Sequence, residues 1–391
     1  MKTICFVSLG DLVATKGGIH RVTNCLMSEL EKTGYRCIYL FYPLDESCYY
    51  TNNVEDEVHR LSTGQVEDYL NREKVDVVVY QQAICSMSFT KLISSFKSRR
   101  FKYISVFHSS PTIYEKTFTL QRLWYNFLNQ GGFLTKVSNF VRILAYPLWK
   151  RRLIQGTGKM FATNYDTSDK CVMLSAKDIP MLSHYIKRDV SDKCVTIHNP
   201  LTFDRIETAE CLSCKRKNVL IVSRLNNFEK RIGKALKIWK KIEADGFNDW
   251  NLYIVGWGLQ ENMLHNLAQK LKLKNVHFEG RKPSEPYYRD ASIFMMTSAV
   301  EGWGLTLTES MQTGVVPIAF DSYPALHDII TDRYDGCIIP DNNLEAYADC
   351  MEELMRNREE RERIAKNGLV SCRRFEINKI VEQWVKLIES L

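Results

Sequence analysis

The sequence predicts an α/β protein with two doubly wound domains, and three observations support this class. Apolar stretches typical of buried parallel strands alternate with helical stretches along the chain. The length of 391 residues exceeds what one ordinary hydrophobic core accommodates, which favours two domains of roughly equal size. Residues 203–216 are polar and irregular, as expected of a linker between domains.

The first half of the chain has the pattern of a parallel sheet. Four strands are expected, at residues 4–9, 37–42, 75–80 and 103–107. A helix at about 19–32 follows the first strand, and Gly17 and Gly18 stand at its start. His108 comes directly after the fourth strand, at the end where open α/β sheets place ligand-contacting residues.

The second half repeats strand–helix units. Its strands are expected at residues 218–222, 252–255, 276–278, 293–296 and 315–320. Helices are expected at 232–242 and 305–312, the latter with Gly314 as its C-terminal cap. Near the C-terminus, six apolar side chains with helical spacing predict an amphipathic helix: Phe375, Ile380, Val381, Trp384, Leu387 and Ile388.

The glycine-rich turn before the expected helix 305–312 predicts a binding site for a diphosphate. Backbone N–H groups of Gly304, Leu305 and Thr306 would point out of the helix N-terminus, where unpaired donors and the helix dipole attract phosphate. Gly302 and Gly304 would let the backbone come close to such a ligand.

Two carboxylates accompany this turn. Glu301 stands at its beginning, and Glu309 lies on the helix behind it. An ionised carboxylate is an acceptor-only group. Beside an anion site, these side chains would therefore bind neutral hydroxyl donors, such as those of a sugar or a ribose.

Two cations follow the expected strand 218–222. Arg224 stands just after the strand, and Lys230 lies six residues further on, in the loop that opens helix 232–242. Such a pair would set two fixed positive charges against a diphosphate leaving group.

The motif Glu301-x7-Glu309, with the Arg224 and Lys230 pair upstream, resembles the retaining glycosyltransferases of the GT-B fold, family 4 or glycosyltransferase group 1. The resemblance implies two facing Rossmann-like domains with the active site in the cleft between them. It implies that Glu301 contacts the donor sugar, that Glu309 holds the ribose, and that Arg224 and Lys230 clamp the donor diphosphate.

The same resemblance extends to further residues. From the first domain, His108 would meet the donor sugar, and Gly17 and Gly18 would line the donor-phosphate pocket. Gly280 and Arg281 would pack on the nucleobase. The remaining donor-binding residues would be those of the turn: Gly302, Trp303, Gly304, Leu305 and Thr306.

The resemblance also divides the chain. It implies an acceptor-side domain at 1–205, a nucleotide-sugar-binding domain at 206–372, and a C-terminal helix at 373–391 that crosses back onto the first domain.

The implied activity is transfer of a hexose or N-acetylhexosamine from a UDP- or GDP-sugar, with retention, to a saccharide or lipid-linked saccharide, in surface polysaccharide biosynthesis. No cofactor and no metal are expected, because the chain lacks the Asp-x-Asp motif that holds a divalent metal under the donor in the other main glycosyltransferase architecture. Two alternatives stay open. Glu301 and Glu309 would also suit a glycoside hydrolase, and the chain would also suit a non-catalytic nucleotide-sugar-binding partner subunit.

A basic and aromatic segment covers residues 87–160. It contains 13 lysines and arginines but one acidic residue, Glu115, although the whole chain carries a net charge of +7. Aromatic side chains such as Trp124, Phe133 and Trp149 lie between these cations. The combination favours contact with an anionic membrane surface or a lipid-linked acceptor over a solvated helical insertion, and nucleic acid is not an expected partner.

Composition predicts a cytoplasmic location, and the basic segment adds the expectation of peripheral attachment at the inner face of the cytoplasmic membrane. Apolar residues make up 45% and charged residues 25% of the chain, which excludes a disordered or fibrous protein. No stretch of 18 residues lacks a charge, so no transmembrane helix is expected. Residues 1–10 have the pattern of a core strand rather than a signal peptide, and the twelve cysteines, Cys211 and Cys214 included, are expected to be free thiols.

Overall fold

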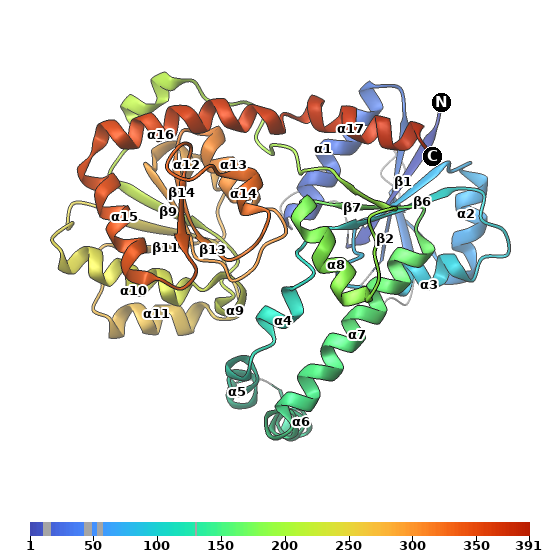
Figure 1. Cartoon of the computed structure of the whole chain (residues 1–391), viewed down its shortest axis with the longest axis horizontal. Helices are drawn as coiled ribbons and strands as arrows, with labels where there is room; N and C mark the ends of the chain where they lie inside the picture. Colours follow the sequence, from blue (N-terminus) through green and yellow to red (C-terminus); the bar gives the residue numbers. More distant parts are fainter. Residues whose placement is uncertain (11–16, 43–48, 53–57, 130) are drawn as a thin grey trace. The chain divides into compact units, whose positions relative to one another are not determined.

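The structure, a computed structural model, describes residues 1–10, 17–42, 49–52, 58–129 and 131–391, which form two compact units (Figure 1). Unit 1 comprises Met1–Thr202 together with Phe375–Leu391, and unit 2 comprises Phe203–Arg374. Each unit is a sheet with helices packed on it, which confirms the predicted α/β class with two Rossmann-like halves.

Unit 1 is built on an eight-stranded sheet with the order β4-β3-β2-β1-β5-β6-β7-β8. Its strands are β1 (Thr3–Leu9), β2 (Arg36–Tyr42), β3 (Tyr49–Asn52), β4 (Val58–Leu61), β5 (Val77–Tyr80), β6 (Lys102–Phe107), β7 (Lys170–Met173) and β8 (Cys194–Thr196). The pairings of β3 with β2 and β4 are antiparallel, and the others are parallel. Strands β1, β2, β5 and β6 confirm the four expected strands of the first half.

The helices of unit 1 come from both of its segments, Met1–Thr202 and Phe375–Leu391. They are α1 (Gly18–Lys32), α2 (Val66–Arg72), α3 (Ser88–Ser94), α4 (Ile113–Thr117), α5 (Leu120–Asn129), α6 (Phe133–Leu144), α7 (Tyr146–Thr167), α8 (Ile179–Ile186) and α17 (Ile377–Glu389). Helix α17 lies against α1 and buries Trp384, Ile380 and Ile388 (Figure 1). The apolar stripe predicted for the C-terminal helix is therefore its packing face.

Unit 2 has a parallel six-stranded sheet with the order β11-β10-β9-β12-β13-β14. Its strands are β9 (Asn218–Val222), β10 (Asn251–Val255), β11 (Val276–Gly280), β12 (Ile293–Met296), β13 (Val316–Asp321) and β14 (Cys337–Pro340). The helices are α9 (Asn227–Lys230), α10 (Ile232–Ala244), α11 (Glu261–Lys270), α12 (Glu285–Asp290), α13 (Leu305–Gln312), α14 (Leu326–Ile329), α15 (Leu344–Arg356) and α16 (Arg358–Ser371). The five expected strands and both expected helices are present, and β14 was not predicted.

The polar segment 203–216, expected as a linker, packs on unit 2. The Gln312 side-chain amide donates hydrogen bonds to the carbonyls of Phe203 (2.7 Å) and Arg205 (3.0 Å). A short 3-10 helix, Ala209–Cys214, follows and buries Leu212 in the core of unit 2. The segment thus follows the division between the two units and packs on unit 2 through these hydrogen bonds and through Leu212.

The buried face of α17 predicts a stability effect. Replacing Trp384 by Ala should lower the free energy of unfolding by about 3–5 kcal/mol, because the buried indole leaves a cavity. Denaturant unfolding of purified protein measures this. Glu382→Ala, on the exposed side of the same helix, should change it by at most about 0.5 kcal/mol. Equal stabilities of the two variants would contradict the packing role of α17.

Candidate functional site

The predicted site residues of unit 2 gather at one edge of its sheet. From β9 the chain adds β10 and β11 on one side and then β12, β13 and β14 on the other. The strand order therefore reverses between β9 and β12, and ligands of open α/β sheets bind at the carboxyl ends of strands at such a point. Arg224 and Lys230 follow β9, and Glu301 follows β12.

Lys230 and Glu301 form a direct ion pair. The Lys230 ammonium lies 2.5 Å from Oε1 of Glu301, and both side chains are mostly buried. The Ser298 hydroxyl donates a second hydrogen bond, of 2.7 Å, to the same oxygen. The structure thus brings together one predicted cation and one predicted carboxylate, which the sequence separates by 71 residues.

The two loops that carry this pair are also joined through their backbones. The Thr297 hydroxyl donates to the carbonyl of Lys230 at 2.9 Å, and the Ala299 N–H donates to the carbonyl of Glu229 at 2.7 Å. The position of the Lys230 ammonium relative to Glu301 is therefore set by backbone as well as by charge.

Arg224 lies on the same loop but is directed differently. Its guanidinium is largely exposed and lies 3.3 Å from Oε2 of Glu229. An exposed guanidinium at the carboxyl end of a strand is accessible to a ligand, and Glu229 holds it near the loop.

Two glycines seat the Arg224 loop on the neighbouring turn after β10. A Cβ on Gly256 would lie 1.8 Å from the Ser223 carbonyl oxygen, and one on Gly258 would lie 2.6 Å from that of Leu225. The Leu225 N–H donates to the Trp257 carbonyl at 2.9 Å. The Gly-x-Gly pattern that resembles a dinucleotide fingerprint therefore allows two backbones to touch.

The turn after Glu301 opens helix α13 as predicted. Gly304 has a φ of +96°, and a Cβ there would lie 2.7 Å from the Tyr323 hydroxyl, so the position suits glycine. The Trp303 side chain is buried, which fixes the turn from within. Leu305 and Thr306 begin the helix. The first N–H groups of an α-helix have no carbonyl acceptor within the helix.

Tyr323 lies near this turn and near Glu301. Burial and then the charge of Glu301 raise the pKa of the Tyr323 hydroxyl. The hydroxyl therefore stays protonated beside the carboxylate.

Glu309 is buried on α13 rather than exposed beside the turn. The Tyr288 hydroxyl, from α12, lies 3.2 Å from its Oε2 and 3.2 Å from the Thr306 carbonyl. This contact places the carboxylate behind the first turn of α13.

The turn after β11 lies beside the exposed ring of Trp257. Gly280 has a φ of +65° and accepts a hydrogen bond from the Gly256 N–H at 2.8 Å. The Arg281 guanidinium lies 5.8 Å from the centre of the Trp257 ring, which is 55% exposed. Sequence reasoning gave Trp257 no role, and a tryptophan between two glycines was the available signal.

In unit 1 the strand order reverses between β1 and β5. Gln81 follows β5, His108 follows β6, and His108 Nε2 lies 2.5 Å from the Gln81 side-chain oxygen. Burial lowers the pKa of His108 to about 3, so its ring is neutral. Gly17 and Gly18 stand at the start of α1, directly after residues 11–16, which lie outside the described residues.

His108, Gly17 and Gly18 belong to unit 1, whereas the other predicted site residues belong to unit 2. A site shared between them stays a prediction.

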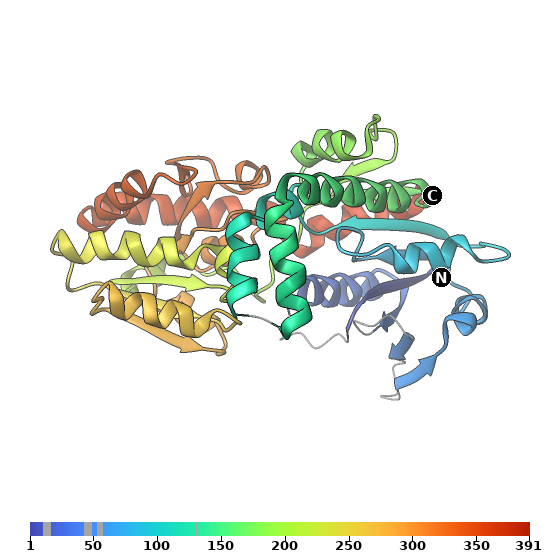
Figure 2. The same cartoon turned by 90° about the horizontal axis from the view of Figure 1, so that it is seen from below.

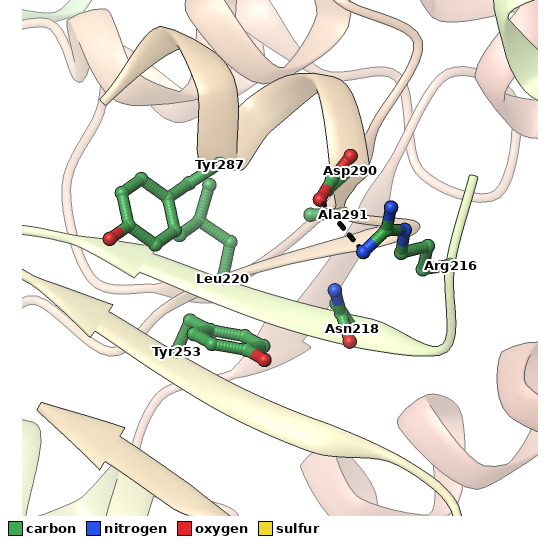
Figure 3. Close-up of a pocket in the computed structure, with 7 residues that line it drawn as sticks. All are labelled: Arg216, Asn218, Leu220, Tyr253, Tyr287, Asp290 and Ala291. Atoms are coloured by element: carbon green, nitrogen blue, oxygen red, sulfur yellow. Dashed lines mark ion pairs between the residues drawn. The ribbon is translucent and has the colours of Figure 1, made fainter. Parts of the chain in front are cut away.

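A small pocket of about 100 Å³ lies elsewhere in unit 2 (Figure 3). Its lining includes Asn218, the first residue of β9, and the ion pair of Arg216 with Asp290 at 3.5 Å. It is near the amino end of β9 and is smaller than the several hundred Å³ typical of ligand sites. We therefore do not assign it to the site.

Three further observations bear on chemistry and location. Among the described residues, no three His, Cys, Asp or Glu side chains come together in an arrangement suited to a metal ion. The eleven cysteines within the described ranges are free thiols. In the same ranges, no helix combines the length and apolar character that crossing a membrane requires.

Comparisons with known proteins add a family and a fold. Residues 205–370 match the family model "Glycosyl transferases group 1". The chain is 28% identical over 235 residues, 60% of its length, to an uncharacterized glycosyltransferase of Haemophilus influenzae. It is 26% identical over 66% of its length to a Campylobacter jejuni N-acetylgalactosaminyltransferase named for a diphosphoundecaprenol-linked substrate. These matches span 64% and 66% of the two relatives.

A solved structure has the same architecture over the whole chain. The Anabaena protein HepE, in complex with UDP, superposes with a TM-score of 0.68 at 13% identity and covers 100% of both chains. The two Rossmann-like units therefore form the GT-B fold.

The neutral His108 predicts a pH dependence of stability. An unfolded chain protonates histidine near pH 6.5, whereas the folded protein, with its pKa of about 3, does not. The stability that the neutral ring contributes to the folded protein is fully present above about pH 6.5 and is lost as the pH falls towards 3. Between these values, the unfolding free energy of the wild type should fall more steeply than that of His108→Gln, by up to about 1.4 kcal/mol per pH unit. Urea unfolding at several pH values measures both slopes, and parallel slopes would contradict the assignment.

Proposed function

Residues 205–370 belong to the glycosyl transferases group 1 family and the chain has the GT-B fold, and on this premise we propose that it is a glycosyltransferase. It would move a hexose or N-acetylhexosamine from a UDP- or GDP-sugar to a saccharide or lipid-linked saccharide acceptor during surface polysaccharide biosynthesis. The observation that carries the proposal is the Lys230–Glu301 ion pair at the strand-order reversal of unit 2.

The residues divide the chemistry between them. The ammonium of Lys230 and the guanidinium of Arg224 stabilise charge that grows on the departing nucleoside diphosphate, and the N–H groups at the start of α13 assist. An ammonium has three donors, so Lys230 can bond to both Glu301 and a phosphate oxygen. Glu301, held by Ser298, orients hydroxyls of the donor sugar.

Other predicted residues complete the donor site in this proposal. Glu309, on α13, binds the ribose hydroxyls. These hydroxyls replace the Tyr288 hydroxyl as its hydrogen-bond donor. The turn Gly280–Arg281 lies against the nucleobase, and Trp257 offers a ring on which the base can stack. His108 contributes a neutral imidazole from unit 1 to the sugar.

The proposed reaction retains the anomeric configuration. The bond between the anomeric carbon and the diphosphate oxygen breaks, and the acceptor oxygen forms a new bond on the same face. The acceptor proton passes to the leaving diphosphate. We propose that no metal takes part, because Lys230, Arg224 and the α13 amides supply positive charge where a metal would otherwise stand.

We propose further that the protein acts at the inner face of a membrane as a peripheral enzyme. The basic segment 87–160 contains α6, which exposes Phe133 and Leu134 to solvent, 80% and 82% respectively. Cations beside exposed apolar side chains favour an anionic bilayer surface.

A donor panel tests the proposal. UDP- or GDP-sugars should raise the apparent melting temperature, because a ligand that binds the folded state stabilises it by mass action. Differential scanning fluorimetry ranks the donors, and the stabilising donor should release nucleoside diphosphate with acceptor present, equally in EDTA and in Mg²⁺. Failure of every nucleotide sugar to shift the melting temperature would contradict the proposal. Sugar release from an oligosaccharide without a nucleotide would instead indicate a hydrolase.

A mutation tests the assigned roles. Lys230→Ala should reduce turnover by about 10²–10³, because the lost ammonium faces charge that develops in the transition state. Lys237→Ala removes a similar charge from the exposed side of the adjacent helix α10 and should leave turnover unchanged. Circular dichroism checks that both variants are folded. Wild-type turnover in Lys230→Ala would refute its role.

A further inference from the structure

A long groove lies between α7 and α8 in unit 1, far along the chain from the residues of the proposed donor site. Its volume is about 1120 Å³, which is at the upper end for ligand-binding sites. The lining includes four apolar side chains, Pro147, Ile154, Ala162 and Ile186, and the two tyrosines Tyr146 and Tyr185.

A glycine contact determines how the two helices meet. A Cβ on Gly158, in α7, would lie 2.5 Å from the carbonyl oxygen of Tyr185, near the end of α8. Any larger residue would force the helices apart. The Tyr185 hydroxyl also donates to Oε2 of Glu115 at 2.8 Å, so that this ring is held at the groove.

The described lining residues of the groove include cations and no acidic residue, and the Glu115 carboxylate is engaged by the Tyr185 hydroxyl. Lys150, Arg151 and Lys159 of α7 and Lys187 at the end of α8 belong to its lining. Within the described part of the chain, none of these four side chains forms an ion pair with a carboxylate, whereas the adjacent Arg188 pairs with Asp166. Over the residues that the structure describes, these cations have no carboxylate partner and lie beside apolar side chains. The groove is therefore complementary to an anionic amphiphile.

Exposed apolar side chains also occur near the start of α7. Leu144 and Leu148, on either side of the start of α7, are 70% and 66% exposed. Helices α5 and α6 lie side by side beyond them, and Figures 1 and 2 show this pair at the start of α7. A hydrocarbon chain at the start of α7 would therefore meet exposed apolar side chains beside the cations of the groove.

We propose that the α7–α8 groove binds a membrane lipid with a diphosphate head and a long hydrocarbon chain, as the carrier of the acceptor saccharide. This inference rests on the proposed function, since it names the acceptor class of the same enzyme. The cations bind the diphosphate, and the apolar floor covers the first part of the chain. A free phosphate would use the cations but leave the floor exposed, so the geometry favours the lipid.

Calorimetric titration with farnesyl diphosphate tests the groove directly, with saturating UDP present to occupy the proposed donor site. Farnesyl diphosphate should bind at least about tenfold more tightly than inorganic diphosphate, because the floor buries part of the chain. The double variant Lys150→Ala/Lys187→Ala should weaken its binding by about tenfold or more.

Two further variants separate charge from shape. Ala162→Phe fills the apolar floor without changing charge. It should also weaken the binding of farnesyl diphosphate by about tenfold, provided the melting temperature of the variant is that of the wild type. The matched control Lys91→Ala/Lys97→Ala removes two exposed cations near α3, outside the groove, and should bind as the wild type does. If Ala162→Phe does not fold, the variant Lys150→Ala/Lys187→Ala and its control Lys91→Ala/Lys97→Ala still test whether the groove binds the lipid.

Flotation with vesicles distinguishes the lipid from a general bilayer surface. Phosphatidylcholine vesicles with added undecaprenyl diphosphate should bind the wild type and not the groove variants. Equal binding of farnesyl and inorganic diphosphate, or wild-type binding by the groove variants in either assay, would overturn the proposal. These assays measure lipid binding without turnover. The donor panel can therefore contradict the proposed function while lipid binding at the groove is confirmed, and lipid binding can fail while the donor panel confirms the function.

Discussion

The ion pair of Lys230 with Glu301 is the contact on which the arrangement of unit 2 depends. It joins the loop after β9 to the loop after β12 at the point where strand order reverses. A mostly buried charge is costly without a partner, so each side chain holds the other in place. Arg224 lies six residues before Lys230, and α13 begins four residues after Glu301. Together with the backbone bonds from Thr297 and Ala299, this contact sets the spacing between two cations, a carboxylate and a helix start.

The sequence predicted unit 2 well because its signals are local. The strand Ile293–Met296 and the helix Leu305–Gln312 were predicted with their observed bounds, since an apolar run, a glycine turn and Gly314 delimit them. Strands β3, β4, β7, β8 and β14 were not predicted. Each has only three or four residues, and all of them except β14 contain polar residues. The packing of segment 203–216 was not predictable, because its bonds to Gln312 come from more than 100 residues away.

The candidate site was predictable in residue type but not in its supporting contacts. Motif spacing pointed to Glu301 and Lys230, and the end of a strand pointed to His108, whereas Ser298, Tyr288 and Gln81 were missed. Ser298 and Gln81 contact Glu301 and His108, and Tyr288 contacts Glu309 and Thr306. No spacing rule reveals such partners. The turn Gly256–Gly258 was not among the predicted site residues, and its glycines are required by contact with the backbone of Ser223 and Leu225.

The position of α17 in the chain has a consequence for how the protein is made. Unit 2 is contiguous in sequence, but unit 1 receives its last helix after unit 2 has been completed. During synthesis, unit 2 can therefore fold as soon as it emerges from the ribosome, whereas the surface of α1 that α17 contacts stays uncovered until α17 has been made. The nascent chain thus passes through a stage in which the later unit is finished and the earlier one is still open.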